Sequence, residues 1–570
     1  MWDVRRCAAG ELPSLAQNLR RRIVAVVKRN GGHLASNLGI VELTIALHRV
    51  FNFFRDRLVW DVSHQCYAHK LLTGRDGERF DKIRRAGGYS GYCDAKESPC
   101  DIFSAGHGGT ALSSALGLAV ARDRKKGDAH VMALLGDGSL SCGLTQEALQ
   151  QVASRTGRLI VILNDNGYAI DGSLGSWANG LVRTKRHNVF TDFYGLAYRG
   201  KVDGHDFNEL LPALEWAKGY GRPVLIHAVT RKGRGHREAE KDPIRFHSIA
   251  PAYCDLSSAK THSYGDMLGQ QLCRLAAADP SIVAVTAAMG LGTGLRPFAE
   301  RFPDRFFDVS MAESHAITFA AGLARGGLRP ICAIYSPFAQ RAVDNWFHDV
   351  CLQNLPVILC MDRAGLSCSD GDTHHGLFDI ALFSNFPNCI FAQPSSLADF
   401  CGLLGAALRV GGPFLIRYQR GAAGLPTGIP TPMEIGRARK IREGKDVSLW
   451  ALGQRRLEQA QELAVLLAER HVGAEVVDAR FIVPLDRELL VRSARRRLLV
   501  SLEDHVIPGG FGSHLLHELQ NYPLRPDFLP IGWPFPVGFA ESEKILEERC
   551  CQSTEQLLEK IFARQKKLIP

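Results

Sequence analysis

The sequence has 570 residues, a length beyond that at which one hydrophobic core keeps growing, and it therefore predicts about three or four domains. Hydrophobic residues make up 46% of the chain and charged residues 22%, which is typical of a soluble globular protein and argues against a membrane or disordered one. The opening residues MWDVRRCAAGELP hold no apolar core of a secretory signal, so we expect a cytoplasmic protein. The fifteen cysteines are scattered and never spaced as C-x-x-C, which favours reduced thiols over a disulfide framework.

The net charge of +10 raises the question of nucleic-acid binding. The basic runs, at 122–126 and 495–497, are short and lack interleaved aromatic residues. We therefore interpret them as solvated helix faces and expect neither a nucleic-acid nor a membrane partner. Anionic small-molecule substrates would also suit a basic protein.

Apolar runs of strand length alternate with helical patterns along the whole chain, which predicts the α/β class with parallel sheets. The predicted strands, in chain order, are 131–135, 159–163 and 223–229 in a first block, 282–288, 331–335, 357–361, 389–394 and 414–418 in a second, and 447–452, 474–479 and 498–503 in a third. A charged, Gly-rich stretch ends the first block, and a Pro- and Gly-rich stretch ends the second. We place three domains at residues 1–255, 256–430 and 431–570.

Two polar residues follow neighbouring strands of the first block. Asp137, flanked by Gly136 and Gly138, comes directly after the strand at 131–135, and Asn166 follows the strand at 159–163. Ligands of open α/β sheets bind at the carboxyl ends of strands, so these two loops can meet on one ion. Carboxylate and amide oxygens suit a Mg²⁺ ion that shares phosphate oxygens. Gly-Asp-Gly alone is more often a turn, and it is the spaced pair that favours a magnesium diphosphate site.

A dinucleotide-binding fold is the obvious competing interpretation of an α/β chain. It requires G-x-G-x-x-G directly after a strand, and the sequence offers only the run GLGTG at 290–294. We therefore set this interpretation aside.

Residues 306–327 read as a strand entering an Ala-rich helix, with Glu313 as the acidic residue at the entry. The local sequence leaves two interpretations open. Ser310 and Glu313 match a capping box, in which the carboxylate satisfies only a backbone amide. The same carboxylate could instead serve a cofactor.

Several motifs together carry a resemblance to a known family. They are GGHLASNLG (31–39), WDVSHQCYAHK (60–70), VDGHD (202–206), EKDPIRFH (240–247), AIYSPFAQRA (333–342), DRAG (362–365), DGDTHHG (370–376) and YQRG (418–421). The Gly-Asp-Gly and Asn pair resembles the thiamine-diphosphate-binding pattern of the transketolase superfamily. From about residue 30 to residue 512 the chain resembles the 1-deoxy-D-xylulose-5-phosphate synthase family, and this breadth is more specific than any single motif.

The resemblance implies a cofactor, thiamine diphosphate with Mg²⁺, and residues that hold it. The side chains of Asp137 and Asn166 and the main-chain carbonyl of Tyr168 would bind the metal. Glu313 would hydrogen-bond N1′ of the aminopyrimidine and Phe338 would stack on that ring. Further cofactor contacts are expected from Gly136, Gly138, Ser139, His64 and His107.

The resemblance also implies the reaction. Pyruvate would lose CO₂ on the cofactor, and the two-carbon unit would pass to D-glyceraldehyde 3-phosphate, giving a precursor of isoprenoids, thiamine and pyridoxal. Arg363 and Arg420 would bind the acceptor phosphate, because the arginine fork suits phosphate oxygens, although a lone arginine is more commonly a surface ion-pair partner. The expected catalytic histidines and the remaining substrate contacts are His33, His64, His247, Tyr335, Arg341, Asp370 and His374.

One further cluster has two interpretations. Asp370, Asp372, His374 and His375 could be imagined as metal ligands, but Asp-Gly-Asp-Thr is equally a turn, and we favour the turn.

The chain departs from the family pattern at several places. The segment between Asn166 and VDGHD is clearly shorter, and GHSST is replaced by a sequence with Gly108 and Gly109 in place of the two serines. Ser314 and Gln419 alter two other motifs, and a family arginine is replaced near Gly290. None of these changes removes a predicted catalytic group, but they put lid behaviour, efficiency and acceptor choice in question.

The resulting prediction is a transketolase-type chain with two thiamine-diphosphate-binding parallel-sheet domains and a transketolase C-terminal domain. The resemblance implies a homodimer whose active site is formed by the first two domains of one subunit. Two alternatives remain. One is a related carboligase or transketolase with another acceptor, and the other is a non-catalytic regulatory paralogue, which would be marked by loss of Asp137, Asn166 or Glu313.

Overall fold

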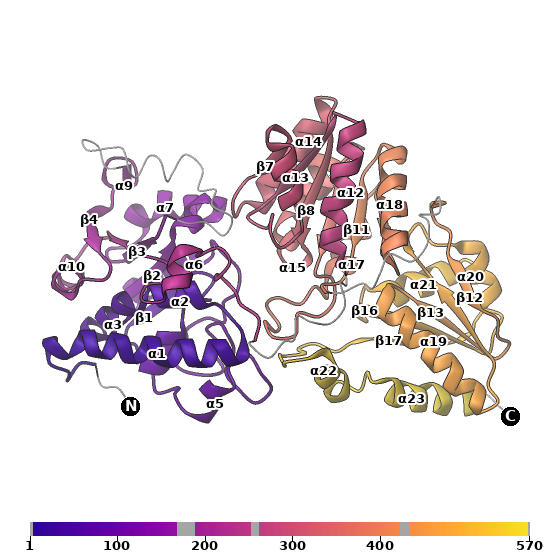
Figure 1. Cartoon of the computed structure of the whole chain (residues 1–570), viewed down its shortest axis with the longest axis horizontal. Coiled ribbons are helices and arrows are strands. Elements are labelled where there is room, and N and C mark those ends of the chain that lie inside the picture. Colours follow the sequence, from indigo (N-terminus) through magenta and orange to yellow (C-terminus); the bar gives the residue numbers. More distant parts are fainter. Residues whose placement is uncertain (1–3, 168–188, 252–261, 422–432, 568–570) are drawn as a thin grey trace. The chain divides into compact units, whose positions relative to one another are not determined.

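The computed structural model describes residues 4–167, 189–251, 262–421 and 433–567. The chain divides into two compact units. Unit 1 comprises Met1–Leu256 with Ser310–Ala312, and unit 2 comprises Ser257–Val309 with Glu313–Pro570. Figure 1 shows the elements of both. Among the described helices, none combines the length and apolarity that crossing a bilayer requires.

Unit 1 is built on one parallel five-stranded sheet in the order β1-β2-β3-β5-β4. Its strands are β1 (Arg57–Trp60), β2 (Val131–Gly136), β3 (Ile160–Asp165), β4 (Ala197–Asp203) and β5 (Val224–Val229). Its helices are a 3₁₀ turn (Ala9–Glu11), α1 (Leu12–Asn30), α2 (Leu34–Gly39), α3 (Val41–Val50), α4 (Tyr67–Leu72), α5 (Glu78–Asp81), α6 (Ala111–Arg124), a 3₁₀ turn (Asp137–Ser141), α7 (Gly143–Arg155), α9 (Val189–Asp192), α10 (Phe207–Gly219) and α11 (Arg237–Lys241).

Helices cover both faces of this sheet. Successive side chains of a strand point to opposite faces, so β2 sends Met132 and Leu134 into a core with α1, α3 and α10, and Ala133 and Leu135 into a second core with α6 and α7. Strands buried on both faces read as continuous apolar runs, which is why β2, β3 and β5 could be predicted from the sequence.

Unit 2 contains two sheets. The first has the order β15-β10-β11-β9-β8-β6-β7 and is parallel except for β15, which pairs antiparallel with β10. Its strands are β6 (Ile282–Thr286), β7 (Phe306–Asp308), β8 (Arg329–Tyr335), β9 (Ile358–Asp362), β10 (Ile390–Ala392), β11 (Phe414–Arg417) and β15 (Phe481–Val483). Its helices are α12 (Tyr264–Ala278), α13 (Arg296–Arg301), a 3₁₀ turn (Pro303–Arg305), α14 (Glu313–Arg325), α15 (Ser336–Ala339), a 3₁₀ turn (Gln340–Ala342), α16 (Val343–Asn345), a π-helical turn (Trp346–Cys351), α17 (Asp379–Phe383) and α18 (Leu397–Val410), with α12 and α18 side by side in Figure 1.

The second sheet of unit 2 has the order β12-β14-β13-β16-β17, with β12 antiparallel to its neighbour. Its strands are β12 (Arg439–Arg442), β13 (Val447–Ala451), β14 (Ala474–Asp478), β16 (Leu498–Val506) and β17 (Asp527–Trp533). Its helices are α19 (Gln454–Glu469), α20 (Arg487–Ser493), α21 (Phe511–Leu519), α22 (Glu543–Arg549) and α23 (Thr554–Lys566). Because β15 follows β14 in sequence but joins the first sheet, the two sheets are bound into one unit.

Every strand predicted from an apolar run is present, within a few residues at its ends. The sequence missed β1, β4, β12, β15 and β17. β4 and β12 are polar and at most partly buried over most of their length, β1 and β15 have only four and three residues, and β17 contains Pro530, so none of them carries a clear apolar run. The predicted domain boundaries at 255 and 430 both fall in ranges outside the described residues, and they stay predictions.

A buried ionic network holds the long irregular segment between α5 and α6. Arg75 donates to both oxygens of Asp101 at 2.6 and 2.7 Å, and His69 Nε2 lies 3.1 Å from the same carboxylate. Lys70, fully buried, pairs with Glu97. Burial alone would raise the pKa of Asp101, but the hydrogen bonds from Arg75 and His69 hold it below its usual value. The network therefore keeps charged groups in the interior of unit 1.

We predict that Asp101→Ala destabilises unit 1 by about 3–5 kcal/mol, because it leaves the buried Arg75 guanidinium without its partner. Differential scanning calorimetry should show a clear fall in the unfolding midpoint. Glu78→Ala, which breaks the exposed pair with Lys82, is the control and should leave the midpoint unchanged. Equal midpoints for the two variants would contradict the structural role of the network.

Candidate functional site

The predicted metal residues of unit 1 lie at adjacent strand ends. β2 and β3 pair in parallel with Gly136 opposite Asn164, so the loops that follow them run side by side. Asp137 Oδ2 accepts hydrogen bonds from the backbone amides of Asn166 at 3.0 Å and Gly167 at 2.8 Å. The two loops converge as the spacing predicted. Tyr168, the third predicted ligand, lies outside the described residues.

The electrostatics at this point fit a divalent cation. Burial and the neighbouring Asp165 carboxylate raise the pKa of Asp137 to about 6. Asp165 is itself paired with His227 at 2.8 Å. A partly buried carboxylate next to a second one is stabilised by a cation that prefers oxygen ligands. No three or more His, Cys, Asp or Glu residues gather into a metal cluster in the described ranges, whereas one carboxylate with an amide and a carbonyl oxygen is a donor set suited to a magnesium diphosphate.

Asp61, which the sequence interpretation missed, ties this loop to the glycine segment 106–110. Its carboxylate, just after β1, accepts from the amides of Gly109 at 2.9 Å and Ala111 at 3.1 Å, and from the Ser139 hydroxyl. The predicted cofactor residues Ser139 and His107 thus lie on segments joined by one carboxylate. The available signals were the position of Asp61 within the motif WDVSHQCYAHK (60–70) and directly after an apolar run.

Gly109 explains one departure from the family pattern. Its φ is +82°, and a Cβ there would lie 2.6 Å from Cβ of Cys142. A serine at this position would need both a strained backbone and the space that Cys142 occupies. The glycine and the cysteine are therefore compatible with each other in this chain.

Three of the predicted histidines come together. The ring centroids of His33, His64 and His247 lie 5.2 to 5.4 Å apart. Burial, together with Lys232 and the two neighbouring imidazoles, holds the pKa of His247 well below its usual range. A neutral imidazole can accept a proton. The ring of Tyr92, which the sequence interpretation missed, lies 5.6 Å from His33.

In unit 2, Glu313 is the first residue of α14. A capping box would require it at the third helical position, so that interpretation is wrong. The carboxylate is buried and accepts a hydrogen bond from Arg341 Nη1 at 3.2 Å. Burial raises the pKa of Glu313, partly offset by Arg341. A buried carboxyl group of raised pKa can share a proton with a ring nitrogen, which fits the role expected toward an aminopyrimidine.

The predicted phosphate residues follow two paired strands. Arg363 comes directly after β9 and Arg420 shortly after β11, and these strands pair in parallel. Arg363 Nη2 donates to the Tyr335 hydroxyl at 2.8 Å, and Arg420 lies 3.8 Å from Asp370. The nearby Arg363 charge lowers the pKa of Arg420, whose side chain is 54% exposed. Two guanidinium groups held close enough to repel each other are typical of an anion site.

Aromatic rings and one glycine complete this cluster. The Phe338 ring lies 5.8 Å from Tyr335 and 5.5 Å from His374. A Cβ on Gly292 would lie 1.6 Å from the Tyr335 hydroxyl and 3.3 Å from Arg363 Nη2. The glycine run at 290–294 thus gives Tyr335 and Arg363 their space, a role the sequence interpretation did not assign.

The alternative metal cluster at 370–375 is contradicted for the described residues. Asp372 Oδ1 accepts from the amides of Val537 and Gly538, and His375 contacts the Gly538 carbonyl at 2.8 Å. The side chains of Asp372 and His375 therefore make hydrogen bonds to backbone groups.

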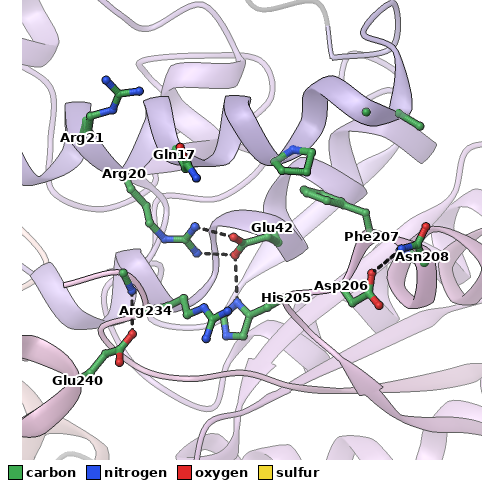
Figure 2. Close-up of a pocket in the computed structure, with 14 residues that line it drawn as sticks. Gln17, Arg20, Arg21, Glu42, His205, Asp206, Phe207, Asn208, Arg234 and Glu240 are labelled. Carbon is green, nitrogen blue, oxygen red and sulfur yellow. Dashed lines mark hydrogen bonds and ion pairs between the residues drawn. The ribbon is translucent and has the colours of Figure 1, made fainter. Parts of the chain in front are cut away.

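A cavity of about 890 Å³ lies elsewhere in unit 1, and none of the predicted site residues lines it. Figure 2 shows residues that line it, among which Arg20 and His205 both contact Glu42. Hydrogen bonds from His205 and Arg20 outweigh the effect of burial and lower the pKa of Glu42 to about 2. Three arginines and three carboxylates line the cavity, so its charges balance and favour no class of ligand.

A transketolase-type enzyme is the class that fits these features: parallel sheets with converging strand-end loops, a carboxylate and amide pair, and a buried glutamate at the start of a helix. Family models match the chain in the same sense. The model described as 1-deoxy-D-xylulose-5-phosphate synthase matches residues 1–194 and 182–230, the transketolase pyrimidine binding domain matches 260–425, and the transketolase C-terminal domain matches 436–545.

Curated relatives named 1-deoxy-D-xylulose-5-phosphate synthase include proteins of Methylacidiphilum infernorum and Thermomicrobium roseum. Each is 43% identical to this chain, and each alignment covers 93% of this chain and 91% of the relative. A solved transketolase from Campylobacter jejuni aligns over 98% of this chain and 100% of that one, with 18% identity and a TM-score of 0.46. The chain belongs to the 1-deoxy-D-xylulose-5-phosphate synthase family, whose cofactor is thiamine diphosphate. The family and fold predictions from the sequence are confirmed.

Proposed function

We propose that this protein decarboxylates pyruvate and transfers the two-carbon unit to D-glyceraldehyde 3-phosphate, forming 1-deoxy-D-xylulose 5-phosphate. Family membership supports the reaction. The observation that carries the acceptor assignment is the pair Arg363 and Arg420 at the ends of two paired strands, with Tyr335 and Asp370 beside them. Two cations in that position favour a phosphorylated acceptor over a neutral aldehyde.

The residues of unit 1 would hold the diphosphate end of the cofactor. Asp137, Asn166 and the Tyr168 carbonyl would bind Mg²⁺, with cofactor contacts from Gly136, Gly138, Ser139, His64 and His107. His33, His64 and His247 would give and accept protons on the substrates.

The residues of unit 2 would hold the ring and the acceptor. Glu313 would share a proton with the aminopyrimidine, and Phe338 would stack on it. When bound, thiamine diphosphate supplies the carbanion that attacks pyruvate and retains the two-carbon unit. Tyr335, Arg341, Asp370 and His374 would orient the acceptor, and Arg363 and Arg420 would bind its phosphate.

Three further proposals follow, of which the first rests on the resemblance to the family and the other two on the sequence pattern. They are a homodimer, a cytoplasmic location, and domain boundaries at 1–255, 256–430 and 431–570. The alternative carboligase shares every cofactor residue and differs only in acceptor. A non-catalytic paralogue is disfavoured because Asp137, Asn166 and Glu313 are all retained.

The proposed function is tested by supplying the purified protein with thiamine diphosphate, Mg²⁺ and pyruvate, and comparing D-glyceraldehyde 3-phosphate with unphosphorylated D-glyceraldehyde. We expect a clear preference for the phosphorylated aldehyde in kcat/KM. Equal use of both aldehydes would favour the alternative carboligase.

Asp137→Ala should abolish retention of the cofactor, because it removes the only predicted carboxylate ligand of Mg²⁺. Calorimetric titration of thiamine diphosphate with Mg²⁺ present measures the effect. Asp206→Ala is the control. It removes a carboxylate that accepts a hydrogen bond from the amide of Asn208 at the start of α10, and this variant should bind thiamine diphosphate as the wild type does. Wild-type affinity in Asp137→Ala would refute the metal assignment.

Glu313→Gln should lose most turnover while the fold survives, because glutamine keeps the shape but cannot share the proton. Exchange of the thiazolium C2 proton, followed by NMR, separates cofactor activation from later steps. Glu300→Gln, which alters an exposed ion pair with Arg296, is the matched control. Near-normal exchange in Glu313→Gln would mean that the carboxylate is only structural.

Arg363→Ala and Arg420→Ala should each weaken acceptor affinity by roughly tenfold to two-hundredfold, because a charge-assisted hydrogen bond contributes about 1.5–3 kcal/mol. KM for D-glyceraldehyde 3-phosphate measures this effect, and KM for pyruvate should change much less. Unphosphorylated D-glyceraldehyde is the control substrate, and the variants should use it about as well as the wild type. Equal losses with both aldehydes would argue against phosphate recognition.

A further inference from the structure

The predicted acceptor residues Asp370 and His374 lie on an irregular loop, residues 365–377, between β9 and α17. The two ends of the loop are joined by two backbone hydrogen bonds of 2.8 Å between Gly365 and Gly376. Inside it, the amide of His374 donates to the Gly371 carbonyl at 2.9 Å. The position of the two side chains therefore depends on what holds the loop as a whole.

The loop is fastened to a segment from the other end of unit 2, residues 537–540, which follows β17. Asp372 Oδ1 accepts from the amides of Val537 at 3.0 Å and Gly538 at 2.7 Å. In return, the amide of Ala540 donates to the Cys368 carbonyl at 3.0 Å. These contacts join segments separated by more than 150 residues in sequence, as the separations of 165 and 166 between the bonded residues show.

His375 adds a bond whose direction can be assigned. Its Nδ1 accepts from the backbone amide of Ser367 at 2.9 Å, so the proton of the neutral ring lies on Nε2. That Nε2 then donates to the Gly538 carbonyl at 2.8 Å. The ring is 1% exposed, so this bond is shielded from competing water.

The ends of the loop also lie beside Arg417, the last residue of β11. Arg417 is fully buried. Its Nη2 donates to the Gly376 carbonyl at 3.5 Å and to the Asp504 carbonyl at 3.0 Å, and the amide of Val506, the last residue of β16, donates to the Leu377 carbonyl at 3.2 Å. The loop is thus bound by groups at the end of β16 and after β17.

We propose that Asp372 and His375 are positioning residues, through which the C-terminal part of the chain holds the 365–377 loop in the conformation that binds the acceptor. This inference rests on the proposed function for the roles of Asp370 and His374. It gives residues 537–540 a part in acceptor binding that their distance in sequence from the site residues does not suggest. Neither Asp372 nor His375 contacts a reacting group in this account.

The test compares three variants. Asp372→Ala removes the acceptor of two amides and should raise KM for D-glyceraldehyde 3-phosphate about tenfold, the effect of about one lost hydrogen bond. Its KM for pyruvate and its kcat at saturating acceptor should stay within about twofold of the wild type. A twofold change is much smaller than the effect of losing one hydrogen bond. Asp372→Asn keeps an oxygen acceptor and should restore the wild-type KM. Asp446→Ala is the matched control, because Asp446 also caps a backbone amide, that of Gly473 at 2.7 Å, in the second sheet of unit 2.

Hydrogen exchange of the protein without cofactor gives a readout that is independent of turnover. Peptides covering 365–377 and 533–540 should exchange faster in Asp372→Ala than in the wild type, and not in Asp446→Ala. Unchanged exchange in both peptides, or a loss of pyruvate and acceptor affinity in equal measure, would overturn the positioning role. If the wild type shows no preference for the phosphorylated aldehyde, the proposed function fails, while the exchange result still tests the fastening of the loop.

Discussion

Parallel strands bring their carboxyl ends to one edge of a sheet, and the proposed chemistry of this protein depends on that constraint. In unit 1, β2 and β3 deliver Asp137 and Asn166 to adjacent loops. In unit 2, β8, β9 and β11 deliver Tyr335, Arg363 and Arg420 to one cluster. Residues far apart in sequence become neighbours because their strands are neighbours.

The same edges hold ionisable groups whose pKa values are shifted by burial or by a neighbour of like charge. Asp137 lies next to a second carboxylate and has its pKa raised to about 6 by burial and that neighbour. Arg420 lies near Arg363, which lowers its pKa. Glu313 is buried at the start of a helix. Each of these groups would be stabilised by a ligand of opposite charge or by a shared proton, which is the pattern expected of binding sites rather than of structural ion pairs such as Arg75 with Asp101.

The sequence predicted those features that depend on local pattern. Apolar runs identified most of the buried strands, and the residues after two of them identified Asp137 and Asn166, whereas Arg363 and Arg420 were predicted from the resemblance to the family. What it missed depends on contacts across the chain. Asp61 matters because its carboxylate joins two loops, Gly292 because Tyr335 needs its space, and Asp372 because residues 537–540 lie beside it. No local pattern distinguishes such residues from ordinary turn residues, and the capping-box match at Glu313 shows that a local pattern can also mislead.

The central claim is that the two-carbon unit of pyruvate ends on a phosphorylated aldehyde. The most direct measurement is ¹³C NMR of the products formed from pyruvate labelled at C2, with D-glyceraldehyde 3-phosphate, thiamine diphosphate and Mg²⁺ present. The account predicts that the label appears at the ketone carbon of 1-deoxy-D-xylulose 5-phosphate, and only when the phosphorylated acceptor is supplied. Label that appears only in acetaldehyde or acetoin-type products, with the acceptor left unconsumed, would contradict it.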